Sequence, residues 1–542
     1  DNGLNQYSIG VSGNYMKVVN EGGIYLGVVP KDGTISDTIL GFNGVNSNSD
    51  STRNLNYIGM YGIGSELTNN AIISDRATGT TTNNSTKALG IYGEKKDLSG
   101  IITNTGTINI GKEGLGIFGL GENTTNRIDV KNTGLITANS GTGVASKWGI
   151  IDQKNNSILL QGASSVGIFG EGSDLTIGKT EIKDETVLES IPNPTTNSYG
   201  IALRENSFGA TSLTMNDSVE INLSGVNNTG IYGNKISYID STTATDKRLK
   251  IDLGKNGIGM YLTDIQGTAN IKTQNITTGG TTVSGGIYAT SSTGNIDIET
   301  GDITIGNSTV SAPSAGTSFG VYVGAPNSNT GTIKTGNIYV NQTDGTGIYV
   351  KNTKNVTTGD ILSGKNGVYQ EANGSGTLTT GLITLTGTSD DMLGIAVKGS
   401  PVSVDILGIK TSDTAGVITS AGNNLIGIYI PNGSLKVGTD GIDIKGGNNS
   451  TGVYISDTSL AAAIPPTSTV DFGTTSSSIE LGKGSVGIFL ENQKVSNMMK
   501  GTVTVGDSII STLPNKMSTG IYTENVIFNN IIMIKITPPY GM

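Results

Sequence analysis

One pattern of apolar and polar positions recurs along this chain: a glycine, an aliphatic residue and an aromatic residue in direct succession. Gly347-Ile348-Tyr349 is its plainest form, and Phe or Ala takes the aromatic place in some copies. The chain holds 18 copies, spaced 20 to 36 residues apart. Such a unit is typical of proteins built from stacked repeats, in which each repeat contacts its neighbours. The copies start at Gly23, Gly59, Gly90, Gly116, Gly143, Gly167, Gly200, Gly230, Gly259, Gly286, Gly320, Gly347, Gly367, Gly394, Gly427, Gly452, Gly487 and Gly520.

Each copy contains three short β-prone pieces. In the shortest copy they are Ile348–Val350, Val356–Thr357 and Ile361–Leu362, separated by turns rich in Gly, Asn and Lys. The copies from Gly286 and Gly427 divide in the same way. Strands this short are not stable as hairpins, but strands in successive coils can pair in parallel. The sequence therefore predicts an all-β fold, a single-stranded parallel β-helix (β-solenoid) with about three short strands per coil, right-handed as parallel crossovers are.

The repeat divides the chain into three parts. Residues 1–22 are predicted to be an N-terminal coil or entry segment, and residues 23–524 a continuous β-helix of about 18 coils. Residues 525–542 are apolar and out of pattern, which is consistent with a cap, a truncated next domain or an uncertain sequence. In one copy the unit is blurred, and Gly143 and Gly149 compete as its start.

Alternation within a strand predicts which residues face inward. In the copy that begins at Gly167, the aliphatic residues on either side of the glycine lie two apart and share a face. We therefore expect the residue before each glycine and the residue after it to fill the interior. Glycine and the aromatic residue should then point outward. The expected buried set is Ile168, Ile231, Ile287, Ile348 and Ile428.

The outward aromatic residues are expected to form a column on the surface. Its clearest members are Tyr232, Tyr288, Tyr349 and Tyr429. The column is a candidate ligand-contact site, because aromatic faces pack on sugar rings and on apolar ligands. Stacked rings also shield the outer backbone and pack on one another. We favour this second explanation, because a binding platform seldom needs so many identical copies.

Three copies contain insertions between their last strand and the next glycine unit, at residues 181–199, 308–316 and 461–478. Proline occurs in all three stretches, where no ladder hydrogen bond is needed. Insertions at one place of a repeat emerge on one side of the stack. We expect these stretches to project, and we weigh a binding role equally with neutral drift. Their candidate ligand contacts are Glu185, Asn193, Ser314 and Asp471.

The residue types that are absent from the chain exclude several classes of function. The 542 residues include no Cys and no His, which excludes disulfides, Cys-ligated zinc and His-based triads. The net charge is −10 with only 14% charged residues, and no basic patch is present to bind nucleic acid. No apolar run is long enough to span a membrane. Because no signal peptide precedes the repeats, we expect a mature piece or a fragment of a longer protein.

Carboxylates offer the remaining candidate chemistry. Asp297 and Glu299 share a strand face, so a paired-carboxylate glycosidase site is conceivable, although a solvated outer face is the favoured explanation. Asp440 and Asp443 lie near Gly-rich turns that hint at calcium. The nonapeptide repeat of calcium-binding β-rolls is absent. We therefore expect no catalytic residue, no metal and no cofactor.

Two stretches carry a resemblance to a known family. Asn104–Gly111 reads NTGTINIG and Asn228–Gly233 reads NTGIYG, in a chain without Cys. With these features residues 20–524 resemble the passenger regions of large type V autotransporter adhesins, most closely in the fusobacterial style. The resemblance implies a bacterial cell-surface virulence protein that is anchored through a C-terminal outer-membrane translocator which is not part of this sequence. It implies partners among the glycans or proteins of host cells or of other bacteria, and it supplies no short binding motif.

Two classes of function remain open. The first is an extracellular adhesin segment, an elongated stalk that displays loops for attachment and catalyses nothing. The second is a β-helical carbohydrate-active enzyme, a lyase or a tailspike-like hydrolase. Such an enzyme needs a local cluster of carboxylates, Arg or Lys in a cleft. Regular repeats and sparse charge favour the first class.

Overall fold

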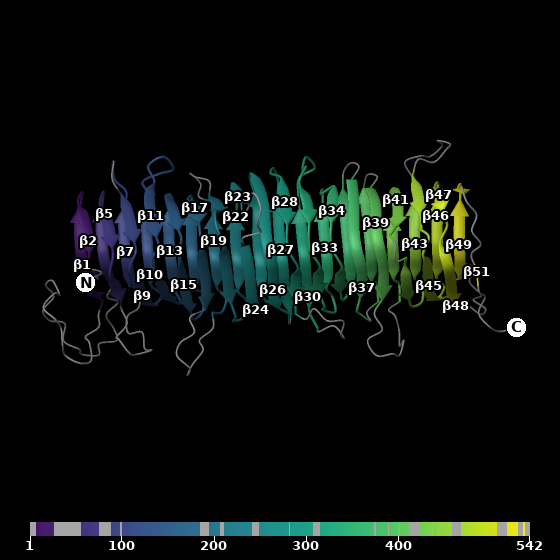
Figure 1. Ribbon diagram of the computed structural model, residues 1–542, viewed down its shortest axis with the longest axis horizontal. Helices are drawn as coiled ribbons and strands as arrows, with labels where there is room; N and C mark the ends of the chain where they lie inside the picture. The colour runs from purple at the N-terminus through teal and green to yellow at the C-terminus, as the bar shows by residue number, and fades with distance from the viewer. Residues whose placement is uncertain are drawn as a thin grey trace, which may run out of the picture. The chain divides into compact units, whose positions relative to one another are not determined.

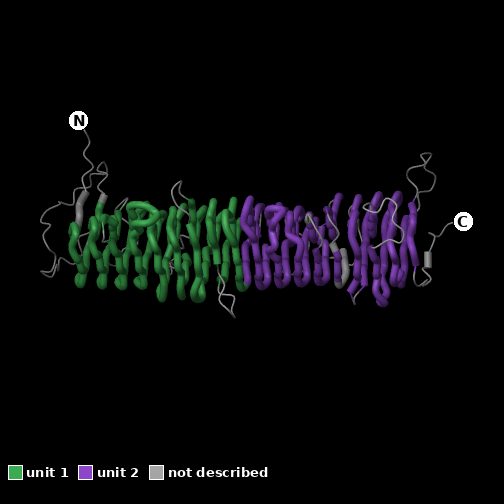
Figure 2. Tube along the Cα trace, turned by 90° about the horizontal axis from the view of Figure 1, so that it is seen from above, with its two compact units in different colours: residues 1–274 green, residues 275–542 purple. Residues whose placement is uncertain are grey.

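The computed structural model is all-β, with no helix in the part of the chain that it describes. The chain forms two compact units, residues 1–274 and residues 275–542, which are described separately (Figure 2). The structure describes residues 7–26, 56–74, 88–97, 100–184, 195–205, 211–240, 249–280, 282–306, 315–372, 376–387, 390–399, 402–411, 423–438, 441–457, 468–506, 518–528 and 535–536.

In the first unit the glycine-containing strands form one parallel sheet in chain order (Figure 1). Each strand pairs with its counterpart in the next coil, as in Met60↔Ile91 and Tyr61↔Tyr92. The sheet consists of β1 (Tyr7–Asn14), β4 (Asn56–Ile63), β7 (Leu89–Glu94), β10 (Leu115–Leu120), β13 (Thr142–Lys147), β16 (Val166–Glu171), β19 (Tyr199–Arg204), β22 (Thr229–Asn234) and β25 (Ile258–Ile265).

Second and third strands complete the coils of the first unit, and they pair in parallel with their counterparts in adjoining coils. The second strands are β2 (Lys17–Asn20), β5 (Glu66–Asn69), β8 (Ile101–Asn104), β11 (Ile128–Asn132), β14 (Gly149–Gln153), β17 (Asp174–Ile177), β20 (Ser212–Met215), β23 (Tyr238–Asp240) and the start of β26 (Thr268–Gly279). The third strands are β3 (Ile24–Tyr25), β6 (Ile72–Ser74), β9 (Thr107–Lys112), β12 (Ile136–Asn139), β15 (Asn156–Gln161), β18 (Thr180–Asp184), β21 (Val219–Leu223) and β24 (Leu249–Lys255).

The second unit repeats this plan. Its first strands are β27 (Val283–Ser291), β30 (Thr317–Gly324), β33 (Thr346–Lys351), β36 (Asn366–Ala372), β38 (Leu393–Gly399), β40 (Ile426–Ile430), β43 (Thr451–Ser456), β46 (Val486–Glu491) and β49 (Thr519–Glu524). Its second and third strands are β28 (Ile296–Glu299), β29 (Ile303–Ile305), β31 (Thr332–Lys334), β32 (Ile338–Val340), β34 (Asn355–Thr357), β35 (Ile361–Ser363), β37 (Gly376–Leu385), β39 (Val402–Thr411), β41 (Gly433–Val437), β42 (Asp443–Gly446), β44 (Thr469–Asp471), β45 (Ser476–Lys483), β47 (Lys494–Asn497), β48 (Lys500–Gly506), β50 (Ile527–Phe528) and β51 (Lys535–Ile536). The predicted parallel β-solenoid with three strands per coil is confirmed, while its handedness stays a prediction.

The aliphatic residue after each glycine fills the interior, as predicted. Ile168, Ile231, Ile287, Ile348 and Ile428 are all 0% exposed. Inward-facing residues of the second and third strands meet them, so each coil adds one layer to an apolar interior. Such burial stabilises a coil by roughly 1.5–3 kcal/mol per large aliphatic side chain.

The predicted orientation of the glycine and its predecessor is wrong. Along β16 and β40 the glycine is buried, whereas Val166 before it is half-buried and Ile426 is 37% exposed. Glycine and the following Ile both face inward, which breaks strict alternation. The reason is a close approach: a Cβ on Gly116 would lie 2.4 Å from the carbonyl oxygen of Gly143 and 2.9 Å from Cγ2 of Ile136. Only glycine lets the first strand approach the third strand this closely.

One of the predicted copies starts elsewhere than the sequence indicated, and one start that the sequence left ambiguous is resolved. Ile24 and Tyr25, after Gly23, form β3 and pair with β6, so they belong to a third strand. The first strand of that coil is β1, where Val11 pairs with Met60. The choice between two glycines near Trp148 falls on Gly143, which lies on β13, while Gly149 opens the second strand β14.

Beyond residue 524, the described residues include two short strands, β50 and β51. β50 pairs with β47 through Ile527, and β51 pairs with β48 through Lys535. They occupy the second and third strand positions of a coil whose first strand is β49. Part of the stretch that looked out of pattern in the sequence therefore follows the same three-strand plan.

Candidate functional surface

The aromatic residues form outward-facing stacks on the first sheet of each unit. In the second unit the ring centroids of Tyr288, Tyr322, Tyr349 and Tyr369 follow one another at 4.7, 4.8 and 4.9 Å, with interplanar angles of 8° or less. These rings are half-buried, and the spacing is that of neighbouring strands. The predicted outer column is therefore confirmed. Whether its members touch a ligand stays a prediction.

Further stacks complete the column within each unit. Tyr429, Tyr454, Phe489 and Tyr522 stack at 5.2, 4.6 and 4.9 Å in the second unit. In the first unit Tyr61 stacks on Tyr92 at 5.4 Å, and Tyr232 on Tyr261 at 6.0 Å.

Two phenols of the column, those of Tyr349 and Tyr92, have a raised pKa and are therefore uncharged at neutral pH. Burial raises the pKa of Tyr349 above its usual 10.0, and charge on the adjoining phenols of Tyr322 and Tyr369 raises it further. Burial likewise raises the pKa of Tyr92, with a contribution from Glu94. A neutral ring face packs on other rings or on the C–H face of a sugar, which is the chemistry that the column offers.

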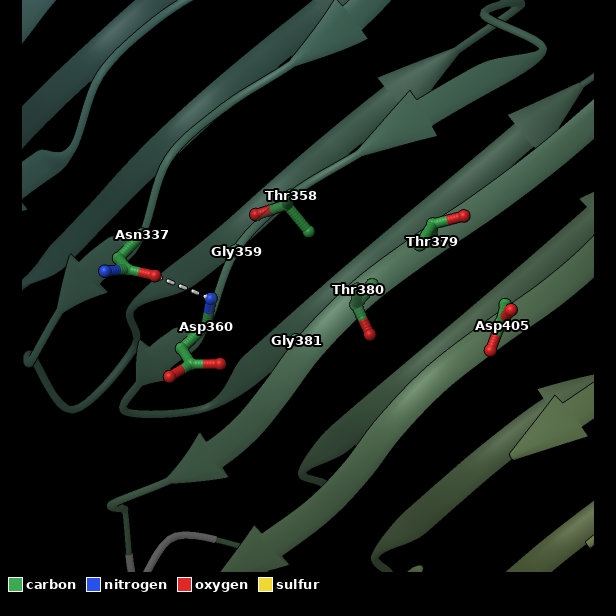
Figure 3. A pocket seen from close by; sticks show the side chains of 8 residues that line it. All are labelled: Asn337, Thr358, Gly359, Asp360, Thr379, Thr380, Gly381 and Asp405. Atoms are coloured by element: carbon green, nitrogen blue, oxygen red, sulfur yellow. Dashed lines mark hydrogen bonds between the residues drawn. The ribbon is translucent and has the colours of Figure 1, made fainter. Parts of the chain in front are cut away.

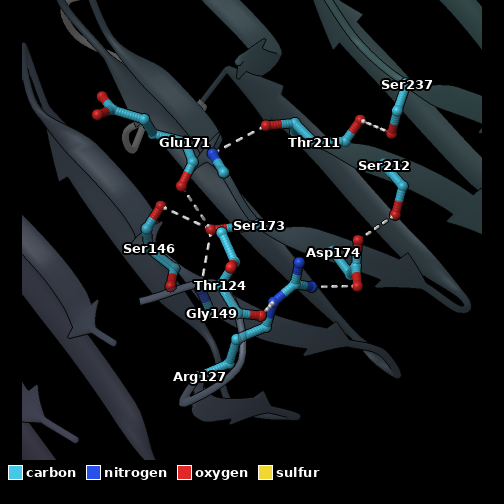
Figure 4. Close-up of polar contacts among 11 residues, drawn as sticks. Thr124, Arg127, Ser146, Gly149, Glu171, Ser173, Asp174, Thr211, Ser212 and Ser237 are labelled. Carbon is cyan, nitrogen blue, oxygen red and sulfur yellow. Dashed lines mark hydrogen bonds and ion pairs between the residues drawn. The ribbon is translucent and has the colours of Figure 1, made fainter. Parts of the chain in front are cut away.

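A corner of the first unit is held by hydroxyl groups (Figure 4). Ser173 Oγ donates to the carbonyl oxygens of Ser146 and Glu171 at 3.2 and 3.0 Å and accepts from the backbone N–H of Gly149 at 3.0 Å. Thr211 Oγ1 accepts from Gly172 N–H at 2.9 Å. These hydroxyls satisfy backbone groups where the chain turns between strands. The chain holds no His that could act as a base for these hydroxyls.

Charged side chains form a column beside the same corner. Glu171 lies between Lys147, at 3.3 Å, and Arg204 on the adjoining coils. Burial alone would raise the pKa of Glu171, but hydrogen bonds and charge from Arg204 and Lys147 outweigh it and lower the pKa below 4.5. Nearby, Arg127 forms an ion pair with Asp174 (Figure 4). Glu171 thus joins three successive coils, and the Arg127–Asp174 pair spans the coil that lies between β11 and β17.

Buried amides form a ladder inside the first unit that the sequence analysis missed. Each Nδ2 donates to the amide oxygen of the next coil: Asn20 to Asn69 at 2.6 Å, then Asn69 to Asn104 and Asn104 to Asn132 at 2.7 Å each. Asn132 donates to Gln153 Oε1 at 2.7 Å. The signal was Asn as the last residue of four successive second strands.

The paired carboxylates of the glycosidase hypothesis contact the adjoining coil. Asp297 Oδ1 accepts hydrogen bonds from Thr332 N–H at 2.8 Å and from Thr332 Oγ1 at 3.3 Å. Glu299 lies 3.6 Å from Lys334 Nζ. Among the described residues, no group of three or more acidic side chains is arranged to hold a metal ion. Asp443 accepts from Ser478 Oγ at 2.7 Å, and Asp440 lies outside the described residues.

A shallow groove of about 430 Å³ follows a corner of the second unit (Figure 3). Asn337 Oδ1 accepts from Asp360 N–H at 2.9 Å, and Asp360 Oδ1 accepts from Leu382 N–H at 2.8 Å. Asp405, at the other side of the groove, pairs with Lys436 at 2.9 Å. The two carboxylates that line this groove thus join coils to one another.

The predicted insertions lie only partly in the described chain. Glu185, Asn193 and Ser314 are outside the described residues, so their roles stay predictions. The expectation that all of 181–199 and all of 461–478 project is wrong, because residues 181–184 belong to strand β18 (Thr180–Asp184) and Thr469–Asp471 form strand β44. Val470 is 0% exposed within the solenoid, so the alternation of this strand places it inside. Asp471 accordingly lies on a strand, where its Oδ1 accepts from Asn497 Nδ2 at 2.9 Å.

The fold defines the class of this protein as a parallel β-solenoid repeat protein. No protein-family model, no curated protein and no solved structure matches the chain. Nor does the described part of the chain contain a helix able to cross a membrane.

Proposed function

We propose that this chain is a segment of an extracellular adhesin on a bacterial surface, which extends and displays a long repetitive face and catalyses nothing. The observation that carries the proposal is the in-register repetition within each unit. Pairings such as Tyr322↔Tyr349 and Tyr349↔Tyr369 place the same chemistry on every successive coil. A surface of this kind binds through many weak contacts that add together.

The partners we propose are glycans or proteins on host cells or on other bacteria. Half-buried aromatic rings line the outer face of the first sheet, which suits uncharged or weakly charged ligands better than nucleic acid. A net charge of −10 also opposes binding to nucleic acid. We place the full-length protein at the outer membrane, anchored through a translocator.

An enzyme of the lyase or hydrolase type is the alternative. Hydrolysis needs one carboxylate as acid and another as base or nucleophile across the bond that is cleaved. Asp297, Glu299, Asp360 and Asp405 each hold a partner in an adjoining coil. A carboxylate that has to remain bound to its neighbour is a poor proton carrier, which favours the adhesin.

Attachment of the purified chain to cells tests the proposal. Fluorescently labelled protein should bind epithelial cells or other bacteria saturably, and unlabelled protein should compete. Deleting residues 185–194, 307–314 or 458–467 one at a time then separates binding by insertions from binding by the column. Absence of saturable attachment to every surface that is tried would overturn the adhesin proposal.

A further inference from the structure

The aromatic column is interrupted in three coils, and the same replacement occurs each time. Alanine takes the aromatic place at Ala145, Ala202 and Ala396. Two residues later in each of these coils stands a cation, namely Lys147, Arg204 and Lys398. Because residues two apart in a strand share a face, each cation lies on the same outward side as the missing ring.

Each of these cations lies over an aromatic ring. Lys147 Nζ is 4.7 Å from the ring centroid of Trp148, and the Arg204 guanidinium is 5.8 Å from that of Phe169. Lys398 differs, because it contacts two rings: its Nζ lies 5.4 Å from Tyr369 and 5.9 Å from Tyr429. Those two rings belong to the coils before and after Ala396. The ammonium of Lys398 therefore lies between them, where a tyrosine ring would complete the column.

The three cations also differ in their anionic partners. Lys147 and Arg204 share the carboxylate of Glu171. The corresponding acid beside Lys398 is Glu371, whose ion pair is with Lys351, at 3.7 Å. Lys398 is exposed, and among the described residues its contacts are the two rings rather than a carboxylate. An exposed cation between two rings offers both an ionic and a stacking partner to a ligand.

We propose that the gap at Ala396, flanked by Tyr369 and Tyr429 and topped by Lys398, binds a six-membered sugar ring that carries one carboxylate. This ligand class is that of the proposed adhesin, so the inference rests on the adhesin function proposed above. The ligand ring takes the place of the missing tyrosine, and the ammonium swings outward on its flexible stem to pair with the carboxylate.

Geometry and charge both fit this ligand. Rings two coils apart are separated by about 10 Å. One further ring therefore fits between them at about 5 Å from each, which is the spacing of the rings elsewhere in the column. The first unit holds an internal example of the ionic part, since the Glu171 carboxylate pairs with Arg204 beside the ring of Phe169. Ala396 is only 2% exposed, so a ligand reaches the space between the two rings only once the Lys398 side chain has moved outward.

Affinity electrophoresis at about 150 mM salt tests the proposal, because such salt screens the general repulsion between an acidic protein and a polyanion. Gels would contain polygalacturonate, which carries one carboxylate per ring, or its methyl ester, which has the same ring without the charge. We expect the first polymer to retard the protein and the ester to retard it far less.

Two variants probe the gap itself. Lys398→Gln removes the charge, and Ala396→Tyr fills the gap with the ring found in neighbouring coils; both should weaken binding about tenfold or more, a loss of at least 1.4 kcal/mol. Lys334→Gln is the matched control, since it removes an exposed charge from another sheet of the same unit and should leave retardation unchanged. Circular dichroism shows whether each variant is folded.

The outcomes separate this proposal from the adhesin proposal. No retardation of the unmodified protein, equal retardation by both polymers, or unchanged retardation of folded Lys398→Gln and Ala396→Tyr would each overturn the sugar site. Cell attachment measured on the same variants reports on the adhesin independently. Attachment that persists while the polymer does not bind leaves the adhesin standing without this site.

Discussion

At the scale of single residues, each repeat needs its glycine because a side chain at that position would clash with neighbouring strands. The carbonyl oxygen of the next coil's glycine would lie 2.4–2.5 Å from a Cβ on Gly59, Gly90 or Gly116. A γ-methyl group of a third-strand Ile closes the other side of the same space. The glycine is therefore repeated because it lets two sheets meet at a corner. Flexibility is not the reason, since none of these three glycines has a positive φ.

Gly116→Ala should accordingly destabilise the first unit by about 1–3 kcal/mol, the usual cost of overpacking. Gly22→Ala is the matched control, because a Cβ at Gly22 meets no atom within 4 Å, and its effect should stay within about 0.5 kcal/mol. Urea unfolding followed by circular dichroism measures both. Equal effects of the two substitutions would show that the close approach has been misjudged.

The Ile that follows the glycine has the opposite role, since it fills space. Ile348 is fully buried, so Ile348→Ala should cost about 2–5 kcal/mol through lost burial and a cavity. Hydrogen exchange should show faster opening of β33, β35 and β36, which meet at this residue. Lys351→Ala, on the exposed end of the same strand, should leave that exchange unchanged.

Glu171 gives the stability of the first unit a dependence on pH. Its pKa is lowered in the folded state, so the ionised carboxylate stabilises the fold above its ordinary pKa of 4.5. That contribution is lost as the pH falls through the lowered pKa. Glu171→Gln should therefore lower stability by about 1 kcal/mol at pH 7 and have little effect near pH 2. A difference that does not shrink in acid would contradict this account.

At the scale of elements, two kinds of ladder hold the coils in register. Rings stack outside, and amides hydrogen-bond inside the first unit. Asn104 is fully buried and bonds to amides on both sides. Removing its side chain leaves buried polar groups without partners. Interrupting the amide ladder therefore lowers the free energy of unfolding more than the loss of one exposed hydrogen bond does.

Asn104→Ala should destabilise the first unit by about 2–4 kcal/mol, since two buried hydrogen bonds are lost. Asn70→Ala is the comparison, because its amide bonds to Glu21 on the exposed outer surface and should cost at most about 0.5 kcal/mol. Thermal unfolding of the two variants side by side measures the difference. Similar melting temperatures would mean that the ladder adds nothing beyond surface hydrogen bonds.

The sequence predicted the strands well and the corners poorly. Strands such as Ile348–Val350 and Ile361–Leu362 were recognisable, because apolar residues alternate between turn residues. The glycine was assigned to the wrong face, because strict alternation does not foresee a corner where two successive residues face inward. Thr469–Asp471 was taken for a loop, because neighbouring prolines masked a strand of only three residues. The amide ladder was missed because it depends on one position repeated across coils.

At the scale of the molecule, each unit is a stack in which every coil offers the same outer positions. In the second unit the gap at Ala396 differs from the regular aromatic column. The paired carboxylates Asp297 and Glu299 lie on a regular coil and contact the next one. Repetition of this kind adds reach and many weak contacts, whereas catalysis needs one preorganised site. We therefore propose that the protein binds glycans or proteins of cell surfaces and leaves them unchanged.

The most direct measurement is the chain length of a bound polysaccharide. Purified protein would be incubated with cell-surface polysaccharide to which it binds, and the polymer would then be sized by gel filtration over many hours. We predict saturable binding with an unchanged size distribution. Progressive shortening of the polymer, abolished by Asp297→Asn or Glu299→Gln, would contradict the account and establish an enzyme.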